Sequence, residues 1–229
     1  MTENRLVSIT SRAKEIISEA KELSVRAGTE KLNIMCVTKN QHTDAIKAIN
    51  NAGISIFGEN KVQQYITKKE FYESIEGEVH FIGHLQSNKV KQAVGAFKLI
   101  QSVDSLEIAR RISDRALQIG VVQDILIEIN AGRDPGKFGF FTEQAEEAIK
   151  EIGQMRGVMI KGLMTIPAIG NDYETTSAFS LMRKLFIDIK RKKSDNAHME
   201  ILSMGMSADY KIAIREGSNM IRLGTVLFN

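Results

Sequence analysis

The feature that most constrains the fold is a regular alternation of short apolar runs with amphipathic helical segments along the 229 residues. The helical segments repeat apolar side chains at spacings of three and four, whereas the short runs are rich in β-branched residues. Such alternation predicts a parallel sheet whose strands are joined by crossover helices. The eight runs cover residues 33–38, 54–57, 79–82, 97–101, 123–129, 158–164, 199–202 and 219–223.

Eight strands in succession predict closure into a (β/α)8 TIM barrel, which needs about 200–250 residues. An open, doubly wound sheet is the alternative. Residues 6–27 form an extra N-terminal helix with one apolar stripe, stopped by Gly28. We expect no helix after the last strand, so the N-terminal helix could cover that gap. With two prolines and no low-complexity linker, residues 1–229 are predicted to be a single domain.

Composition excludes several classes of protein. Lys and Arg number 31 against 28 Asp and Glu, a net charge of +3, too small for a dedicated nucleic-acid binder. The single cysteine forms no intrachain disulfide and no multi-cysteine metal site. Apolar runs stop well short of the ~18 residues that span a membrane, and the N-terminus lacks a signal-peptide core. We expect a cytoplasmic protein.

Small and polar residues gather where the predicted strands end, which is where barrel proteins place their sites. Lys39 follows a buried run, so it emerges from the barrel instead of from a solvated helix face. A partly desolvated lysine amine becomes usable for Schiff-base chemistry. The alternative is a lysine that merely extends past the rim into solvent.

The last two strand ends predict a phosphate site. Gly205 and Ser207 precede a helix expected to begin near residues 208–209, and Gly224 and Thr225 follow the last strand. Glycine allows close backbone approach, and serine and threonine add hydroxyl groups beside backbone amides. The alternative for Ser207 is a plain helix cap. Arg222 could face a pyridine nitrogen in the same pocket, or form a structural ion pair.

Seven segments together resemble the pyridoxal phosphate homeostasis proteins (the YggS/PROSC family), single-domain relatives of the alanine racemase N-terminal barrel. They run in family order along essentially the whole chain. The segments are residues 37–39, 57–63, 80–89, 102–105, 162–167, 202–207 and 221–225.

The resemblance implies that Lys39 carries pyridoxal 5′-phosphate (PLP) as a Schiff base. It also implies that Ser207, Gly224 and Thr225 hold the phosphate and that Arg222 faces the pyridine nitrogen. Four further positions match pocket-lining positions of the family: Asn60, His84, Ser203 and Met204. Two departures could alter loop rigidity. Residues 40–42 lack the proline that usually follows the lysine, and Ala208 replaces a frequent glycine.

Two other patterns are weaker. Residues 132–137 resemble a phosphate loop but are one residue short of the Walker spacing, and Phe138 stands where Mg²⁺ binding needs Ser or Thr. His80 and His84 have the four-residue spacing of helical metal ligands, but they flank a strand end. We therefore predict no metal site.

The resemblance favours a carrier over an enzyme. Alanine racemase uses a second, β-rich domain to supply an opposing acid–base group, and this chain shows no obvious second base. We expect a protein that holds PLP and hands it on, with apo PLP-dependent enzymes as recipients, and that influences vitamin B6 and amino-acid pools. A monomer is the default expectation. The alternatives are a low-activity PLP-dependent racemase or transaminase and a Schiff-base aldolase acting on phosphosugars.

Overall fold

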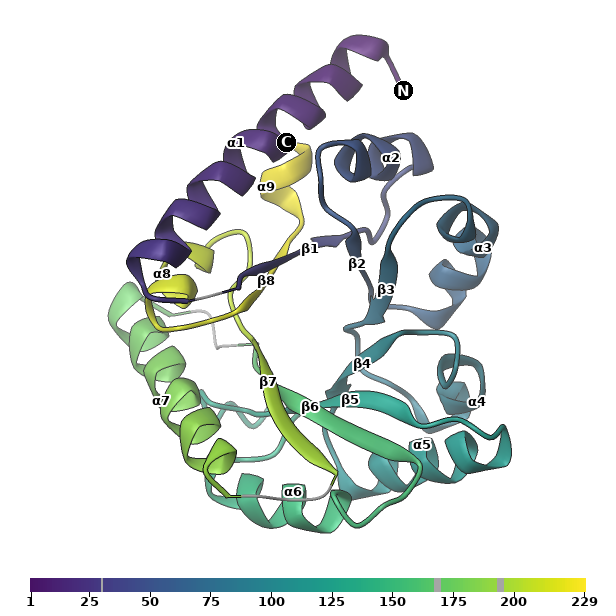
Figure 1. Cartoon of the computed structure of the whole chain (residues 1–229), viewed down its shortest axis with the longest axis vertical. Coiled ribbons are helices and arrows are strands. Elements are labelled where there is room, and N and C mark those ends of the chain that lie inside the picture. The colour runs from purple at the N-terminus through teal and green to yellow at the C-terminus, as the bar shows by residue number, and fades with distance from the viewer. Residues whose placement is uncertain (30, 167–169, 193–195) are drawn as a thin grey trace. The chain divides into compact units, whose positions relative to one another are not determined.

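The computed structural model describes residues 1–29, 31–166, 170–192 and 196–229. Its eight parallel strands form a closed barrel in sequence order (Figure 1). The predicted barrel is confirmed, and the open sheet is excluded. The strands are β1 (Asn33–Val37), β2 (Ile56–Glu59), β3 (Glu78–Phe81), β4 (Leu99–Val103), β5 (Gln123–Glu128), β6 (Val158–Met164), β7 (Ala197–Ser203) and β8 (Met220–Leu223).

Helices alternate with the strands as the sequence pattern predicts. Two short 3₁₀ turns, η1 (Ser87–Lys89) and η2 (Thr142–Gln144), lead directly into helices. The helices are α1 (Glu3–Arg26), α2 (Thr43–Asn51), α3 (Val62–Glu73), α4 (Val90–Ala93), α5 (Leu106–Gln118), α6 (Ala145–Ile152), α7 (Asp172–Lys190), α8 (Tyr210–Arg215) and α9 (Thr225–Phe228).

Local sequence explains where several helices begin. The Asn171 side chain accepts a hydrogen bond from the backbone N–H of Glu174 (3.0 Å), and the Glu174 carboxylate accepts one from the Asn171 N–H (3.2 Å). This reciprocal pair is a capping box, which starts α7. Ser105 caps α5 by accepting the Ile108 N–H at 3.3 Å. In these two helices the polar residue that precedes the apolar pattern therefore fixes the first turn.

Contacts divide the chain into two compact units. The first unit contains residues 1–80 and 204–229, and the second contains residues 81–203. Within the first unit, β1 pairs with both β2 and β8, so that Met35 lies between Ile56 and Arg222. The single domain predicted for residues 1–229 stays a prediction beside this division.

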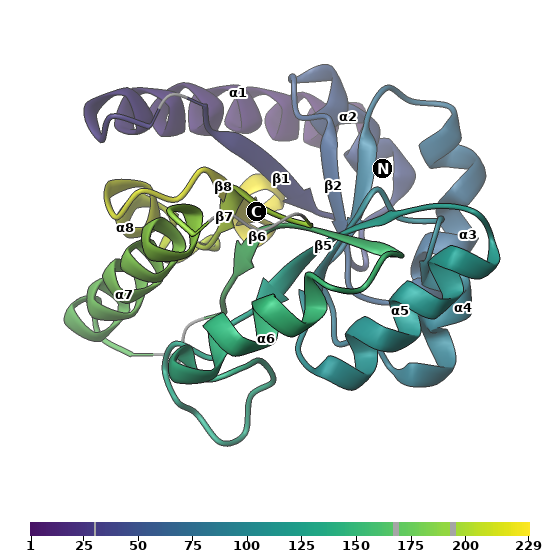
Figure 2. The same cartoon turned by 60° about the horizontal axis from the view of Figure 1, so that its bottom comes forward.

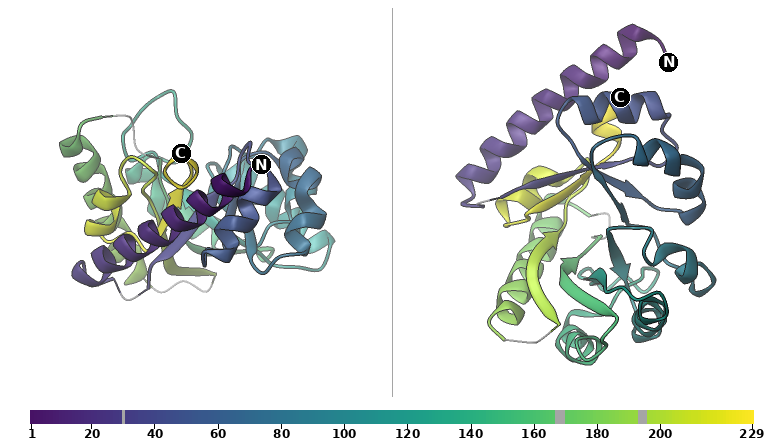
Figure 3. Two further views of the ribbon diagram at one scale, coloured as in Figure 1. Left: turned by 90° about the horizontal axis from the view of Figure 1, so that it is seen from above. Right: turned by 45° about the vertical axis from the view of Figure 1, so that its right-hand side comes forward.

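Helix α1 packs along the outside of the first unit, where it contacts α2, α8 and α9 (Figures 1 and 3). Its buried face carries Ile9, Ala13, Ile16 and Ala20, at the spacing of an amphipathic helix. The expectation that no helix follows the last strand was wrong, because residues 225–228 suffice for the single turn of α9. The N-terminal helix packs against that turn.

The second unit is built around strands with apolar stretches at their centres, such as residues 125–127 of β5. Ile125 and Ile127 of β5 are fully buried, and Leu126 packs against Leu99 and Met164. Three apolar residues in succession are typical of a strand that is covered on both faces. Figure 2 shows α5 and α6 side by side on the outside of this unit, where they are also in contact. None of the described helices is long and apolar enough to cross a membrane.

Candidate functional site

A cavity of about 360 Å³ lies in the first unit, where β1 and β8 end. Five of the nine predicted site residues line it: Lys39, Ser207, Arg222, Gly224 and Thr225. The other lining residues are Val37, Gln41, Met206, Ala208, Phe228 and Asn229. The structure thus brings the predicted amine and the predicted phosphate loops into one cavity.

Ser207 joins the two loops that follow β7 and β8. Its hydroxyl oxygen accepts hydrogen bonds from the backbone N–H of Gly224 (3.1 Å) and of Val226 (3.3 Å). A serine hydroxyl has two acceptor sites and one donor, so these bonds leave its O–H to donate to a ligand. The adjoining helix begins at Tyr210, next to the predicted start near residues 208–209. Before it, the side chain of Asp209 accepts a hydrogen bond from the Met206 N–H.

The loop after β7 also presents backbone donors. Across the described part of the chain, the N–H groups of Ser207 and Ala208 have no hydrogen-bond partner. The turn that exposes them depends on Gly205, whose φ is +96° and whose added Cβ would lie 2.5 Å from the Cβ of Ala213. Consecutive free N–H groups in a turn form a concave site for an anion.

The charged side chains that line the cavity also suit an anion. Lys39 and Arg222 are the charged side chains among its lining residues, and no lining side chain is a carboxylate. Arg222 is only 3% exposed, and its backbone N–H donates to the Gly205 carbonyl at 2.9 Å. A buried guanidinium stays protonated and can only donate hydrogen bonds.

Lys39 stands on a tight turn at the rim of this cavity. The Gln41 N–H donates to the Thr38 carbonyl at 3.1 Å, and Asn40 adopts a left-handed conformation with φ of +59°. Lys39 itself is exposed, so the expectation of a partly desolvated ammonium was wrong. Two residues beyond a strand end, the long side chain clears the apolar barrel wall.

A buried polar network that sequence reasoning missed lies under this turn. Glu59 is fully buried, and its Oε1 accepts hydrogen bonds from Thr38 Oγ1 (2.8 Å), Tyr72 OH (2.7 Å) and Lys68 Nζ (2.8 Å). Burial, together with the nearby Glu59 carboxylate, raises the pKa of the Tyr72 hydroxyl above its ordinary value. The available signal was the Lys68–Tyr72 spacing of four on a helix.

Two predicted residues of the first unit do not line the cavity. Asn60 follows β2 and is half-buried, and its Oδ1 has no partner among the described residues. Met204 is fully buried, and its N–H donates to the Met220 carbonyl at 3.1 Å. Asn60 therefore keeps hydrogen-bonding capacity, whereas Met204 is a packing residue in this arrangement.

The remaining two predicted residues lie in the second unit. His84 Nδ1 lies 2.8 Å from Asp104 Oδ2, and its ring stacks on Phe138 with centroids 3.7 Å apart. Ser203 is buried, and its hydroxyl donates to Gln101 Oε1 at 2.7 Å. Their contact with PLP stays a prediction. Pro167, the last residue of the segment 162–167, lies outside the described residues.

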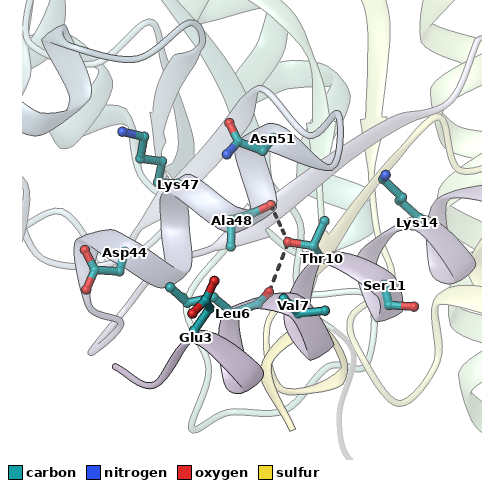
Figure 4. A pocket seen from close by; sticks show the side chains of 10 residues that line it. All are labelled: Glu3, Leu6, Val7, Thr10, Ser11, Lys14, Asp44, Lys47, Ala48 and Asn51. Carbon is teal, nitrogen blue, oxygen red and sulfur yellow. Dashed lines mark hydrogen bonds between the residues drawn. The ribbon is translucent and has the colours of Figure 1, made fainter.

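A larger hollow of about 510 Å³ lies elsewhere in the first unit, between α1 and α2 (Figure 4). Glu3 and Asp44 stand among its lining residues together with Lys14 and Lys47, so no single sign of charge prevails. The Thr10 hydroxyl there already donates to backbone carbonyls of the same two helices, as the dashed lines show. The cavity beside Lys39 is therefore the candidate site.

The fold and the cavity are those of a (β/α)8 barrel protein. The family model described as "Alanine racemase, N-terminal domain" matches residues 13–229 of this chain. A protein of Aquifex aeolicus named "Pyridoxal phosphate homeostasis protein" is 36% identical over 219 residues, which cover 95% of each chain. This chain belongs to the pyridoxal phosphate homeostasis protein family.

Two solved structures are similar to this chain over nearly its full length. A crystal structure of an unknown protein from Bifidobacterium adolescentis has a TM-score of 0.94 at 30% identity, covering 100% of this chain and 97% of its own. The structure of PipY from Synechococcus elongatus, with PLP bound, has a TM-score of 0.83 at 29% identity, covering 96% and 100%. This chain therefore has the same fold as these two proteins.

Proposed function

We propose that this protein holds PLP covalently through Lys39 and hands it on, and so serves the homeostasis of PLP. The observation that carries the proposal is one cavity lined by Lys39 together with Ser207, Gly224 and Thr225, the three residues predicted to hold a phosphate. PLP carries both matching groups, an aldehyde and a phosphate. PLP bound to the related PipY supports the same ligand here.

The residues present fit this cofactor. A volume of about 360 Å³ is in the range of small-molecule sites, which span about 300–1,000 Å³. The Ser207 O–H and the N–H groups of Ser207 and Ala208 are donors suited to a phosphate, and Arg222 supplies positive charge nearby. When bound, PLP would supply an aldehyde that the Lys39 amine would hold through a C=N bond, with the release of one water molecule.

A carrier role accounts for the groups around the site better than catalysis does. We assign Arg222 to the pyridine nitrogen. Because its guanidinium only donates, that nitrogen stays unprotonated and the ring withdraws electrons poorly. The covalent link is reversible by water, which suits storage and delivery. We propose apo PLP-dependent enzymes as recipients, with effects on vitamin B6 and amino-acid pools.

The covalent link is tested by adding PLP to the purified protein, reducing it with borohydride and locating the added mass on peptides. The expected outcome is a yellow protein that loses its colour on reduction, with the mass on the peptide that contains Lys39. Lys39→Ala should abolish both signals, and Lys14→Ala, which removes an exposed lysine of α1, should change neither. Label spread over several lysines in the native protein contradicts the assignment.

Carrier and enzyme are separated by exchange of the α-proton of amino acids in D₂O. The PLP-loaded protein should show no exchange at enzymatic rates across a panel of amino acids. Turnover at ordinary rates would establish a racemase or transaminase instead. A colourless protein that binds a sugar phosphate would establish an aldolase.

A further inference from the structure

One face of α3 carries polar side chains at an interval of four residues: Gln64, Lys68 and Tyr72. Residues four apart on a helix stand above one another. We call these three residues the α3 polar stripe. All three contact the turn that bears Lys39 or the carboxylate beneath it.

Lys68 and Tyr72 of the α3 polar stripe hold Thr38, the residue before Lys39. Lys68 Nζ donates both to the backbone carbonyl of Thr38 and to Glu59 Oε1, each at 2.8 Å. The Tyr72 hydroxyl lies 2.7 Å from Thr38 Oγ1 and donates to the same carboxylate oxygen at 2.7 Å. Thr38 is fully buried, so its backbone and side chain are both fixed by this network.

Gln64 of the α3 polar stripe holds Asn40, the residue after Lys39. Gln64 Nε2 donates to Asn40 Oδ1 at 2.9 Å. Asn40 has φ of +59°, a left-handed conformation that asparagine adopts more readily than most other non-glycine residues. The Gln64 contact holds the Asn40 side chain from outside the turn.

We propose that the α3 polar stripe is the positioning device of Lys39, fixing the backbone on both sides of the reactive amine. Across the described part of the chain, the Lys39 side chain makes no hydrogen bond or ion pair of its own. Its direction is therefore set by the backbone on which it stands. This inference rests on the proposed function and makes Gln64, Lys68 and Tyr72 positioning residues, because none of them lines the cavity.

Positioning of this kind matters because a covalent link forms only when the amine and the bound aldehyde meet at the right distance and angle. The phosphate end is held by the loops around Ser207 and Gly224, and the amine end by α3. Loosening the turn should leave the phosphate site intact and weaken the covalent end alone.

Two variants test the proposal, one at the exposed contact to Asn40 and one at the buried ion pair. Gln64→Ala removes the exposed contact to Asn40 and leaves the buried network unchanged. The double variant Glu59→Gln/Lys68→Met removes the buried ion pair and its tie to Thr38 together, so that no charge is left buried alone. Lys161→Met is the matched control, because it breaks a Lys–Glu hydrogen bond of similar length in the second unit.

The first readout is hydrogen–deuterium exchange of the Gln41 amide in the protein without PLP, since that N–H closes the turn. The second is the rate constant for PLP dissociation from the loaded protein. Both test variants should raise both quantities about three- to tenfold, the equivalent of one hydrogen bond. Lys161→Met should change neither quantity. The affinity for inorganic phosphate, measured by its competition with PLP, should equal that of the native protein in all three variants.

The proposal is overturned if Gln41 exchange and PLP dissociation stay native in both test variants, or if Lys161→Met shifts them equally. Should the double variant fail to fold, Gln64→Ala decides alone. Failure of the proposed function looks different: the native protein would then carry no label on Lys39, while the exchange of Gln41 would still respond to α3.

Discussion

Removing the Ser207 hydroxyl is the sharpest test of the two-loop anion site. In Ser207→Ala the backbone N–H groups of Gly224 and Val226 lose their shared acceptor, at 3.1 and 3.3 Å. A net hydrogen bond contributes about 1 kcal/mol, and the longer of these two contributes less. The free energy of unfolding should therefore fall by about 1.5 kcal/mol in the protein without PLP.

The same substitution also removes the O–H that we assign to the phosphate. A hydrogen bond to a charged group contributes about 1.5–3 kcal/mol, so the dissociation constant for PLP should rise about 10- to 100-fold. Urea denaturation measures the first effect, and titration of the PLP absorbance measures the second.

Ser218→Ala is the matched control for this experiment. Its hydroxyl donates to the carbonyls of Met204 (2.8 Å) and Met220 (3.0 Å) in the same unit, away from the cavity. This control should lose a similar amount of stability and keep native PLP affinity. The reasoning is refuted if Ser207→Ala binds PLP as tightly as the native protein, or if both variants lose affinity equally.

Three further outcomes follow from the first unit. Gly205→Ala should lower the free energy of unfolding by about 2–4 kcal/mol in urea denaturation, because its Cβ would lie 2.5 Å from that of Ala213 at a φ of +96°. Burial raises the pKa of the Cys36 thiol, so iodoacetamide should label it only after unfolding, and stability should fall as the pH rises above about 8.5, where the unfolded thiol ionises. A hydrogen bond from Lys211 lowers the pKa of the Glu19 carboxyl. The carboxylate therefore adds to the free energy of unfolding above its unfolded pKa of about 4.3, and this addition is lost as the pH falls through the lower folded pKa. In a plot of melting temperature against pH, Glu19→Gln should therefore lose less stability at acid pH than the native protein.

The sequence predicted the strands closely, because each contains a short apolar or β-branched stretch between helical segments. β6 was predicted without error, and β4 was predicted two residues early, since Phe97 is apolar but precedes the strand. The helical segment 87–93 was missed because its polar residues form part of a motif that suggested a loop. Single-turn helices leave no periodic pattern to detect.

The site was predicted residue by residue only where the chemistry lies at strand ends. Lys39 and the loops around Ser207 and Gly224 were found in this way. The partner of the Ser207 hydroxyl was not, because a contact to residues 17 or more positions away is invisible to local pattern. The pairing of Lys68 with Glu59 was missed for the same reason: a buried carboxylate looks like any surface glutamate in sequence.

The pairing of β1 with β8 has a consequence for biosynthesis. Ribosomes add about 5–20 residues per second, so Lys39 exists for roughly 10–40 s before Gly224 is made. The second unit is one continuous stretch, whereas the first must wait for residues 204–229 to complete its sheet. The nascent chain thus carries Lys39 for most of translation without the loop that bears Gly224 and Thr225, so the capture of PLP that we propose has to follow synthesis of the last strand.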